Sequence, residues 1–268
     1  MRSTCLQGAP GSGKTRMACL TAINKPIYAI DLDRKILGTK ILEDAVEKGE
    51  LIVEEFSETI SEGSLEDRIS RLAKDQKPAK EPQGWKKIAA MIEGLPKNER
   101  AKSAGTILID SWSAAVDHIV QSILYNASAD RANAVMNQRQ WGQLIQMNRE
   151  AITVAIDVCK YMNKDLIVTV HERVSEIPGA STKIIKAVGG AREFVGQMDV
   201  KIAASIPGQF GIEMARYFNE FYGLEVKIVN GEPKWICRVK PDGKRDLRTS
   251  FNVGDKTEFP CDFREIWK

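Results

Sequence analysis

Apolar residues along the chain gather in short runs and in longer periodic stretches. Short runs predict buried strands, and stretches with apolar residues three or four positions apart predict helices. The predicted strands are 3–7, 27–30, 51–56, 106–109 and 166–170, and the predicted helices are about 13–23, 39–48, 64–74, 85–95, 112–124 and 138–162. This alternation predicts a parallel sheet with helices on both faces.

Three segments interrupt the alternation. Residues 75–83 carry two Pro residues and are interpreted as an exposed connector, and residues 126–133 form a polar break. After residue 172, Gly and Pro residues punctuate the sequence. We therefore expect 173–210 to be a flexible loop segment with a short strand-like run at 200–206.

The last part of the chain predicts a β-hairpin. After a helix at 214–221, strands are expected at 224–229 and 235–239, and Asn230-Gly231 between them is typical of a two-residue hairpin turn. A last strand is expected at 248–251. We therefore expect one α/β domain over residues 1–268: a mostly parallel sheet flanked by helices, with a C-terminal β-hairpin extension.

One loop carries a specific chemical signal. Residues 8–15 read Gly-Ala-Pro-Gly-Ser-Gly-Lys-Thr, which fits the P-loop pattern, and the loop lies between a predicted strand and a predicted helix. Its glycines allow a tight turn, its N–H groups point at the phosphates, and the helix presents its positive end. The residues predicted to hold a nucleoside triphosphate are Gly8, Ala9, Pro10, Gly11, Ser12, Gly13, Lys14, Thr15 and Arg16.

The same loop predicts a magnesium site. Lys14 is expected to reach the β- and γ-phosphates of ATP, and the Thr15 hydroxyl is expected to bind Mg²⁺. A second acid is needed to hold the metal shell. Asp110 supplies it at the end of the apolar run 106–109, as in a Walker B motif. ATP and Mg²⁺ are therefore the expected cofactors.

Hydrolysis also requires a group that orients or deprotonates the attacking water. Asp31 and Asp33 end a neighbouring predicted strand and are candidates, with helix capping or a turn as the alternative role. His171 and Glu172 follow the strand at 166–170. One of them is a candidate for contact with the γ-phosphate or the water, and a structural hydrogen bond is the alternative.

Composition and charge narrow the class of protein. Hydrophobic residues make up 43% and charged residues 28% of the 268 positions, as in a soluble globular protein. The formal net charge of +3 is too small to imply nucleic-acid binding by itself. The five Cys include no Cys-x-x-Cys pair and are expected to be reduced and inert. With no apolar run long enough for a membrane span and no room for a signal peptide, we expect a cytoplasmic location.

Taken together, these residues resemble the RecA-like core. The order is a P-loop, an acid on the next strand, Ile-Leu-Ile-Asp-Ser at 107–111, and a polar pair after 166–170. More closely, the chain is similar to phage RecA-like ATPases linked to recombination and single-strand annealing. The likeness covers residues 1 to about 251 and also includes Trp141-Gly142 and the runs 216–220 and 238–243.

The resemblance implies roles for several residues. Asp33 falls where RecA-like proteins place the glutamate that activates water, and Glu172 falls where they place a glutamine that senses the γ-phosphate. The following segment, 173–210, would contain a loop that binds single-stranded DNA. In an oligomeric ring or filament, basic residues late in the core would reach the neighbouring subunit's nucleotide. The implied DNA loop residues are Arg173, Lys183, Lys186 and Arg192, and the implied intersubunit residues are Lys244, Arg245 and Arg248.

Two residues depart from the RecA-like pattern. Asp33 is one methylene shorter than Glu, which favours slow hydrolysis or the use of Asp31. Glu172 replaces a neutral glutamine, and an anion near the γ-phosphate is unfavourable unless an Arg or Mg²⁺ offsets it.

Three function classes remain open from the sequence. Residues 173–210 carry five basic and three acidic residues, and Phe194 and Phe210 are candidates for base stacking, which favours a DNA-dependent ATPase of phage recombination or replication. A solvated loop with two buried Phe residues is the alternative. A similar ATPase could serve packaging or assembly. A nucleotide or small-molecule kinase is the third class, with the basic segment 240–248 as its lid.

Overall fold

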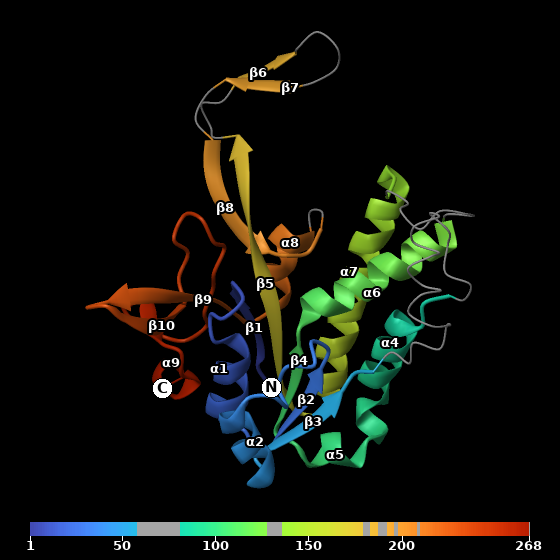
Figure 1. The fold of residues 1–268 in the computed structure, drawn as a ribbon, viewed down its shortest axis with the longest axis vertical. Helices are drawn as coiled ribbons and strands as arrows, with labels where there is room; N and C mark the ends of the chain where they lie inside the picture. Colours follow the sequence, from blue (N-terminus) through green and yellow to red (C-terminus); the bar gives the residue numbers. More distant parts are fainter. Residues whose placement is uncertain are drawn as a thin grey trace.

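The alternating strands form a nine-stranded sheet in the computed structural model of the chain (Figure 1). The structure describes residues 1–57, 81–127, 136–178, 183–186, 192–195, 198–207 and 210–267. For residues 127, 175–178, 183–186, 192–195 and 198–200 it describes the backbone alone. The predicted helix at 64–74, most of the predicted connector and most of the polar break after 126 lie outside these residues.

The predicted strands and helices up to residue 170 that fall within the described residues are present in the predicted order, and α5 is an addition to them. The strands are β1 (Ser3–Gly8), β2 (Ile27–Asp31), β3 (Leu51–Glu55), β4 (Thr106–Asp110), β5 (Asp165–Pro178), β6 (Lys183–Lys186), β7 (Arg192–Val195), β8 (Met198–Ala204), β9 (Glu220–Val229), β10 (Glu232–Arg238) and β11 (Glu258–Pro260). The helices are α1 (Lys14–Thr21), α2 (Lys40–Glu47), α4 (Gly84–Gly94), α5 (Glu99–Ser103), α6 (Trp112–Ala127), α7 (Gln138–Tyr161), α8 (Phe210–Glu213) and α9 (Phe263–Ile266), with 3₁₀ turns η1 (Leu95–Lys97) and η2 (Met214–Tyr217). Among the described residues, no helix combines the length and apolar character that a membrane span needs.

The sheet is mostly parallel. Eight of its strands follow the order β11-β10-β9-β1-β5-β4-β2-β3, and the ninth, β8, pairs with β5 off this path. The strands from β9 to β3 are parallel, β10 pairs antiparallel with β9, and β11 pairs antiparallel with β10. Because the parallel strands point the same way, their carboxyl ends meet at one edge of the sheet, where ligands bind in such folds. The predicted α/β fold class with a C-terminal hairpin is therefore confirmed.

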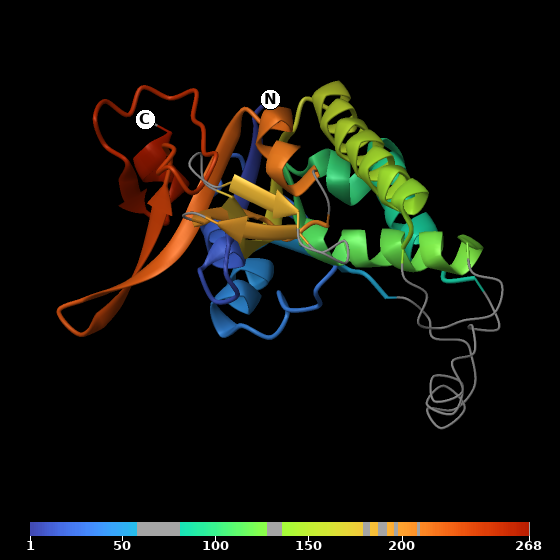
Figure 2. The same ribbon diagram turned by 90° about the horizontal axis from the view of Figure 1, so that it is seen from above.

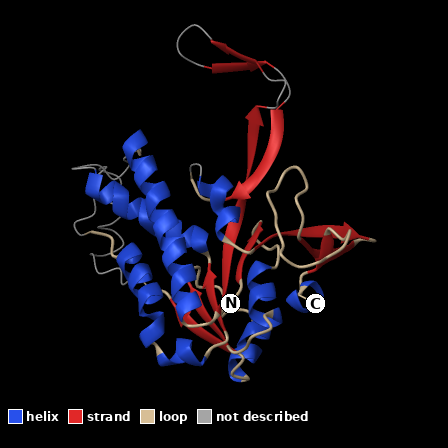
Figure 3. Cartoon of the chain, turned by 180° about the vertical axis from the view of Figure 1, so that it is seen from behind, coloured by secondary structure: helices blue, strands red, loops and turns tan. Residues whose placement is uncertain are grey.

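Successive residues of the central strands point to opposite faces of the sheet and build two cores. Ile107 and Ile109 belong to the core under α4, α6 and α7, whereas Leu108 belongs to the core under α1, α2 and α9. This period of two explains why residues 107–109 are all apolar, since both faces of the strand are covered. Figures 2 and 3 show the helices on the two sides of the strands.

The C-terminal hairpin agrees with its turn signal. β9 and β10 pair antiparallel, with Val229 opposite Glu232. Asn230 and Gly231 have φ values of 56° and 82°, the left-handed conformations that this turn requires. The dipeptide therefore sets the register of the hairpin.

The prediction of a loop over 173–210 is wrong for the described residues, although its strand-like run at 200–206 overlaps β8. β5 does not end at residue 170 but continues to Pro178, and β8 pairs with it antiparallel from Glu172 opposite Ala204 to Pro178 opposite Met198. This two-stranded ribbon projects from the body of the molecule, and the β6–β7 hairpin lies beyond its end (Figure 1). The pairing joins segments distant in sequence, which local periodicity cannot reveal.

Two smaller predictions near the C-terminus are also wrong. The predicted helix at 214–221 ends at Tyr217, because Glu220 already pairs with Thr4 in the parallel sheet. The predicted last strand at 248–251 is reduced to a single bridge between Arg248 and Phe221, and β11 is the last strand of the described chain.

A buried hydrogen bond joins two helices, α6 and α7, on one face of the sheet. Trp112 of α6 donates its Nε1–H to Asn148 Oδ1 of α7 at 3.0 Å, and both side chains are fully buried. Asn148→Ala leaves the indole N–H unsatisfied and is expected to lower the free energy of unfolding by about 1–3 kcal/mol. Urea unfolding followed by circular dichroism measures this change. Gln146→Ala, on the exposed side of α7, is the control and should change stability by less than about 0.5 kcal/mol. Equal losses of stability in Asn148→Ala and Gln146→Ala would contradict a stabilising role for the buried hydrogen bond.

Candidate functional site

The predicted site residues meet at the carboxyl edge of the parallel strands. The sheet register places Gly8 opposite His171 and Asp31 opposite Asp110. β5 lies between β1 and β4, so Asp110 reaches the loop after β1 from beyond the intervening strand. The sheet therefore brings the P-loop, Asp110 and the middle of β5, at His171 and Glu172, to one place.

The backbone of the P-loop depends on its glycines. Gly11 and Gly13 have φ values of 79° and 90°, which L side chains rarely adopt. A Cβ on Gly8 would lie 2.4 Å from Ser12 Oγ and 2.5 Å from the carbonyl oxygen of Leu224. No side chain caps the N-terminus of α1, so the first N–H groups of that helix remain available to an anion.

Lys14 lies inside the loop that precedes it. Its Nζ donates hydrogen bonds to the carbonyl oxygens of Gly8 at 2.7 Å and Ala9 at 2.9 Å, and the residue is 6% exposed. Burial lowers the pKa of Lys14, while the nearby carboxylates of Asp110 and Glu172 act in the opposite direction. The site thus combines the buried cation of Lys14 with the carboxylates of Asp110, Glu172 and Asp33. This arrangement suits a phosphate ligand that carries a bound metal cation.

Asp110 and Thr15 form the candidate metal site. Thr15 Oγ1 donates to Asp110 Oδ2 at 2.7 Å, and Thr169 donates to Asp110 Oδ1. Burial raises the pKa of Asp110, and the two hydroxyl hydrogen bonds oppose that rise. Mg²⁺ prefers oxygen ligands and is commonly bound through one or two carboxylates together with substrate phosphates and water. The oxygen donors of Thr15 and Asp110 therefore fit Mg²⁺.

Asp31 and Asp33, equivalent candidates in the sequence, have different surroundings. Asp31 is fully buried, and its Oδ2 accepts a hydrogen bond from Ile36 N at 2.8 Å, which is the turn role that the sequence left as an alternative. Asp33 lies beyond the end of β2, and its backbone N–H donates to the carbonyl oxygen of Asp110 at 3.3 Å. The structure therefore separates a turn-forming carboxylate, Asp31, from Asp33, whose backbone contacts Asp110 of the candidate metal site.

Asp33 also contacts the first residue of the polar pair after the central part of β5. His171 Nε2 lies 3.4 Å from Asp33 Oδ2, and Lys35 Nζ lies 3.7 Å from the same oxygen. The hydrogen bond with His171, followed by the charge of Lys35, holds the pKa of Asp33 below its usual range despite partial burial. Asp33 is therefore ionised at neutral pH. The backbone of His171 is fixed separately, because its N–H donates to Ser113 Oγ at 3.0 Å.

Glu172, the second residue of the pair, is held by Arg245. Arg245 Nη2 lies 3.4 Å from Glu172 Oε2, while Nη1 lies 2.9 Å from Asp242 Oδ2 and 3.5 Å from Glu225 Oε2. The guanidinium side chain is only 8% exposed. Arg245 therefore offsets the negative charge of Glu172, the role expected from the sequence for an Arg or Mg²⁺ near this carboxylate.

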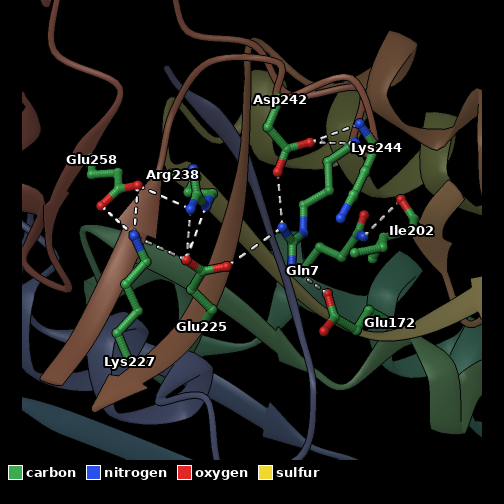
Figure 4. Close-up of polar contacts among 10 residues, drawn as sticks. Gln7, Glu172, Ile202, Glu225, Lys227, Arg238, Asp242, Lys244 and Glu258 are labelled. Atoms are coloured by element: carbon green, nitrogen blue, oxygen red, sulfur yellow. Dashed lines mark hydrogen bonds and ion pairs between the residues drawn. The ribbon is translucent and has the colours of Figure 1, made fainter. Parts of the chain in front are cut away.

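The ion pairs continue from Arg245 across the hairpin, as Figure 4 shows. Glu225 also pairs with Arg238 at 2.9 Å, and Arg238 pairs with Glu258 at 2.9 Å. At the end of this chain, Lys227 Nζ lies 2.7 Å from Glu258 Oε2. A chain of alternating charges therefore connects Glu172, in the middle of β5, with β9, β10 and β11.

The predicted intersubunit residues do not share one environment. Arg245 is buried and paired with Glu172 within its own chain. Lys244 and Arg248 are exposed, so a contact with a neighbouring subunit's nucleotide stays a prediction for these two residues. Of the predicted DNA residues, Arg173 belongs to the ribbon, and the side chains of Lys183, Lys186 and Arg192 lie outside the described ones.

Two site residues were missed in the sequence. Thr169 is a polar residue inside the apolar run 166–170, a signal that could have placed it beside Asp110. Trp235 of β10 donates its Nε1–H to the carbonyl oxygen of Gly11 at 3.2 Å, across 224 positions of sequence. No local pattern connects that tryptophan to the P-loop.

Comparisons with known proteins do not identify the chain. No family model matches it, and no curated protein matches it in sequence. The flagellar accessory protein FlaH from Methanocaldococcus jannaschii is a similar solved structure, with 10% identity, a TM-score of 0.43, and coverage of 94% of this chain and 82% of that chain. The KaiC-like protein PH0186 from Pyrococcus horikoshii OT3 has 13% identity, a TM-score of 0.41, and coverage of 97% and 84%. Likenesses this weak carry no functional conclusion, so the site is interpreted from its own geometry.

The close approach at Gly8 gives a direct test of the loop. Gly8→Ala places a methyl group against the backbone of β9 and is expected to lower the free energy of unfolding by about 1–3 kcal/mol. Gly94→Ala is the matched control at the end of α4, because no atom lies within 4 Å of its added Cβ. The control should be neutral or stabilising by up to about 1 kcal/mol. Chemical unfolding of both variants measures the difference, and an undisturbed Gly8→Ala protein would contradict this geometry.

Proposed function

We propose that the chain binds ATP with Mg²⁺ at residues 8–15 and hydrolyses it. The observation that carries this proposal is the 2.7 Å hydrogen bond between Thr15 Oγ1 and Asp110 Oδ2. A P-loop hydroxyl and a Walker B carboxylate are the two protein groups that hold Mg²⁺ in P-loop NTPases. Their direct contact supports a metal site that needs little rearrangement.

The residues of the site have complementary roles in this proposal. Lys14 and the first N–H groups of α1 bind the phosphate oxygens. Mg²⁺, when bound, neutralises negative charge that develops on the phosphates. Asp33 accepts a hydrogen bond from the attacking water and orients it. Because the pKa of Asp33 is lowered, this carboxylate is a weak base, which favours orientation of the water and slow hydrolysis.

We infer further that nucleotide state is coupled to the β5–β8 ribbon. Glu172 is the first residue of β5 that pairs with β8, and its carboxylate lies close enough to influence the pKa of Lys14. A shift of Glu172 on γ-phosphate binding would therefore move the start of the ribbon. The proposed partner is single-stranded DNA, and the proposed assembly is a homo-oligomer with Lys244 and Arg248 at the neighbouring nucleotide.

The proposed task, as the sequence resemblance implies, is phage recombination or replication. A packaging or assembly ATPase would use the same site. The kinase alternative needs a mobile basic lid, but Arg245 is held in the middle of the segment 240–248 by Asp242, Glu172 and Glu225. This fixed arrangement favours an ATPase over a kinase.

Phosphate release from ATP tests the proposed hydrolysis. Lys14→Ala should abolish release, and Asp33→Asn should lower kcat by about 100-fold or more with little change in KM, because the water loses its acceptor. Asp31→Asn should reduce kcat less than Asp33→Asn does. Asp157→Asn, an exposed site on α7, is the control and should keep the wild-type rate. Full activity of Asp33→Asn would exclude its role, and no phosphate release by the wild type would overturn the proposed hydrolysis.

The proposed partner is tested by adding single-stranded DNA to the same assay. We expect DNA to raise the rate of phosphate release at low salt, because ribbon and nucleotide are coupled. Replacing Lys183 and Lys186 together by Glu should lower the ratio of rates with and without DNA. Lys160→Glu on α7 makes the same type of charge change away from the ribbon and should keep that ratio. No stimulation and no mobility shift with the wild type would count against DNA as the partner.

A further inference from the structure

A groove opens beside the P-loop, between α1 and the C-terminal strands. Its volume is about 790 Å³, and it begins at Gly13 and Arg16. Its other walls come from β10, β11 and the residues that follow β11, including Pro233, Trp235 and Phe259. The groove therefore continues directly from the phosphate loop, on the side away from Asp110 and β4.

Trp235 stands at the junction of the groove and the loop. Its Nε1–H donates to the carbonyl oxygen of Gly11 at 3.2 Å, and its ring would lie 3.0 Å from a Cβ on Gly13. The side chain is nevertheless 42% exposed. One edge of the indole is thus tied to the loop while part of the ring remains open, an arrangement suited to stacking against a second flat group.

Arg16 lies on the opposite wall, one residue after the proposed metal ligand Thr15. It is exposed in the first turn of α1 and lines the groove. A planar guanidinium stacks on aromatic rings and also hydrogen-bonds to phosphate oxygens. The mouth of the groove therefore offers an indole and a guanidinium next to the phosphate loop.

We propose that this groove holds the nucleoside part of the bound triphosphate, with its aromatic base stacked on Trp235. The proposal rests on the proposed function, because the phosphates in residues 8–15 direct the rest of the nucleotide into the groove. The groove is large enough for a base and a ribose together. It assigns base recognition to a residue from the C-terminal hairpin, 220 positions after Thr15 in the sequence.

Two ligands separate the base from the phosphates in the test. Isothermal titration calorimetry measures the Kd of ATP and of inorganic tripolyphosphate, both with Mg²⁺, for the wild type and for Trp235→Ala. Stacking of a base on an aromatic ring corresponds to about 5- to 100-fold in affinity. We expect Trp235→Ala to weaken ATP binding by a factor in this range and to leave tripolyphosphate binding within about threefold.

Further variants distinguish stacking from other effects of the substitution. Trp235→Phe keeps a ring without the N–H and should retain most of the ATP affinity, whereas Trp235→Leu keeps an apolar side chain and should lose it. Lys14→Ala should weaken both ligands. A thermal midpoint without ligand, measured for each variant, identifies loss of folding, and Trp235→Phe against Trp235→Leu then provides the comparison.

Each failure has a different meaning. Equal weakening of both ligands by Trp235→Ala would overturn base stacking, because the residue would then act only on the phosphate loop. Unchanged ATP affinity in Trp235→Ala and Trp235→Leu would also overturn it and leave the proposed function intact. A wild-type protein that binds neither ligand would contradict the proposed function itself, and the base site with it.

Discussion

The hydrogen bond between Thr15 and Asp110 is the contact that joins the phosphate loop to the candidate metal site. It joins the first helical turn after the P-loop to the end of β4, although β5 separates β1 from β4 in the sheet. Such a contact requires the parallel strands to end at the same level, which their register provides. The two packed cores on either side of the sheet hold these strands in place, so folding and the proposed metal site have a common basis.

A second set of contacts extends the site toward the periphery. Glu172 ends the central part of β5 and begins its pairing with β8, and Arg245 connects it to the carboxylates of Asp242 and Glu225. Partly buried ion pairs are costly to break one at a time, because a lone buried charge remains. The network therefore favours concerted movement of the ribbon and the hairpin, which is the behaviour that coupling to nucleotide state would need.

The sequence predicted those features that depend on local pattern. The P-loop at 8–15 is a contiguous motif, and Asp110 follows an apolar run whose burial on both faces is visible in the sequence. The extension of β5, the pairing of Arg245 with Glu172 and the contact of Trp235 with Gly11 depend on partners 20 to 224 positions away. Asp31 and Asp33 could not be distinguished because β2 ends at Asp31, and the turn after it decides where each carboxylate lies.

The effect of Mg²⁺ on ATP affinity, measured by titration calorimetry with the wild type and Thr15→Ala, tests whether Thr15 and Asp110 hold the metal. If Thr15 and Asp110 form the metal site, Mg²⁺ strengthens ATP binding to the wild type and has little effect on Thr15→Ala. Wild-type affinity that is unchanged by Mg²⁺, or an equal gain in the variant, would contradict the account.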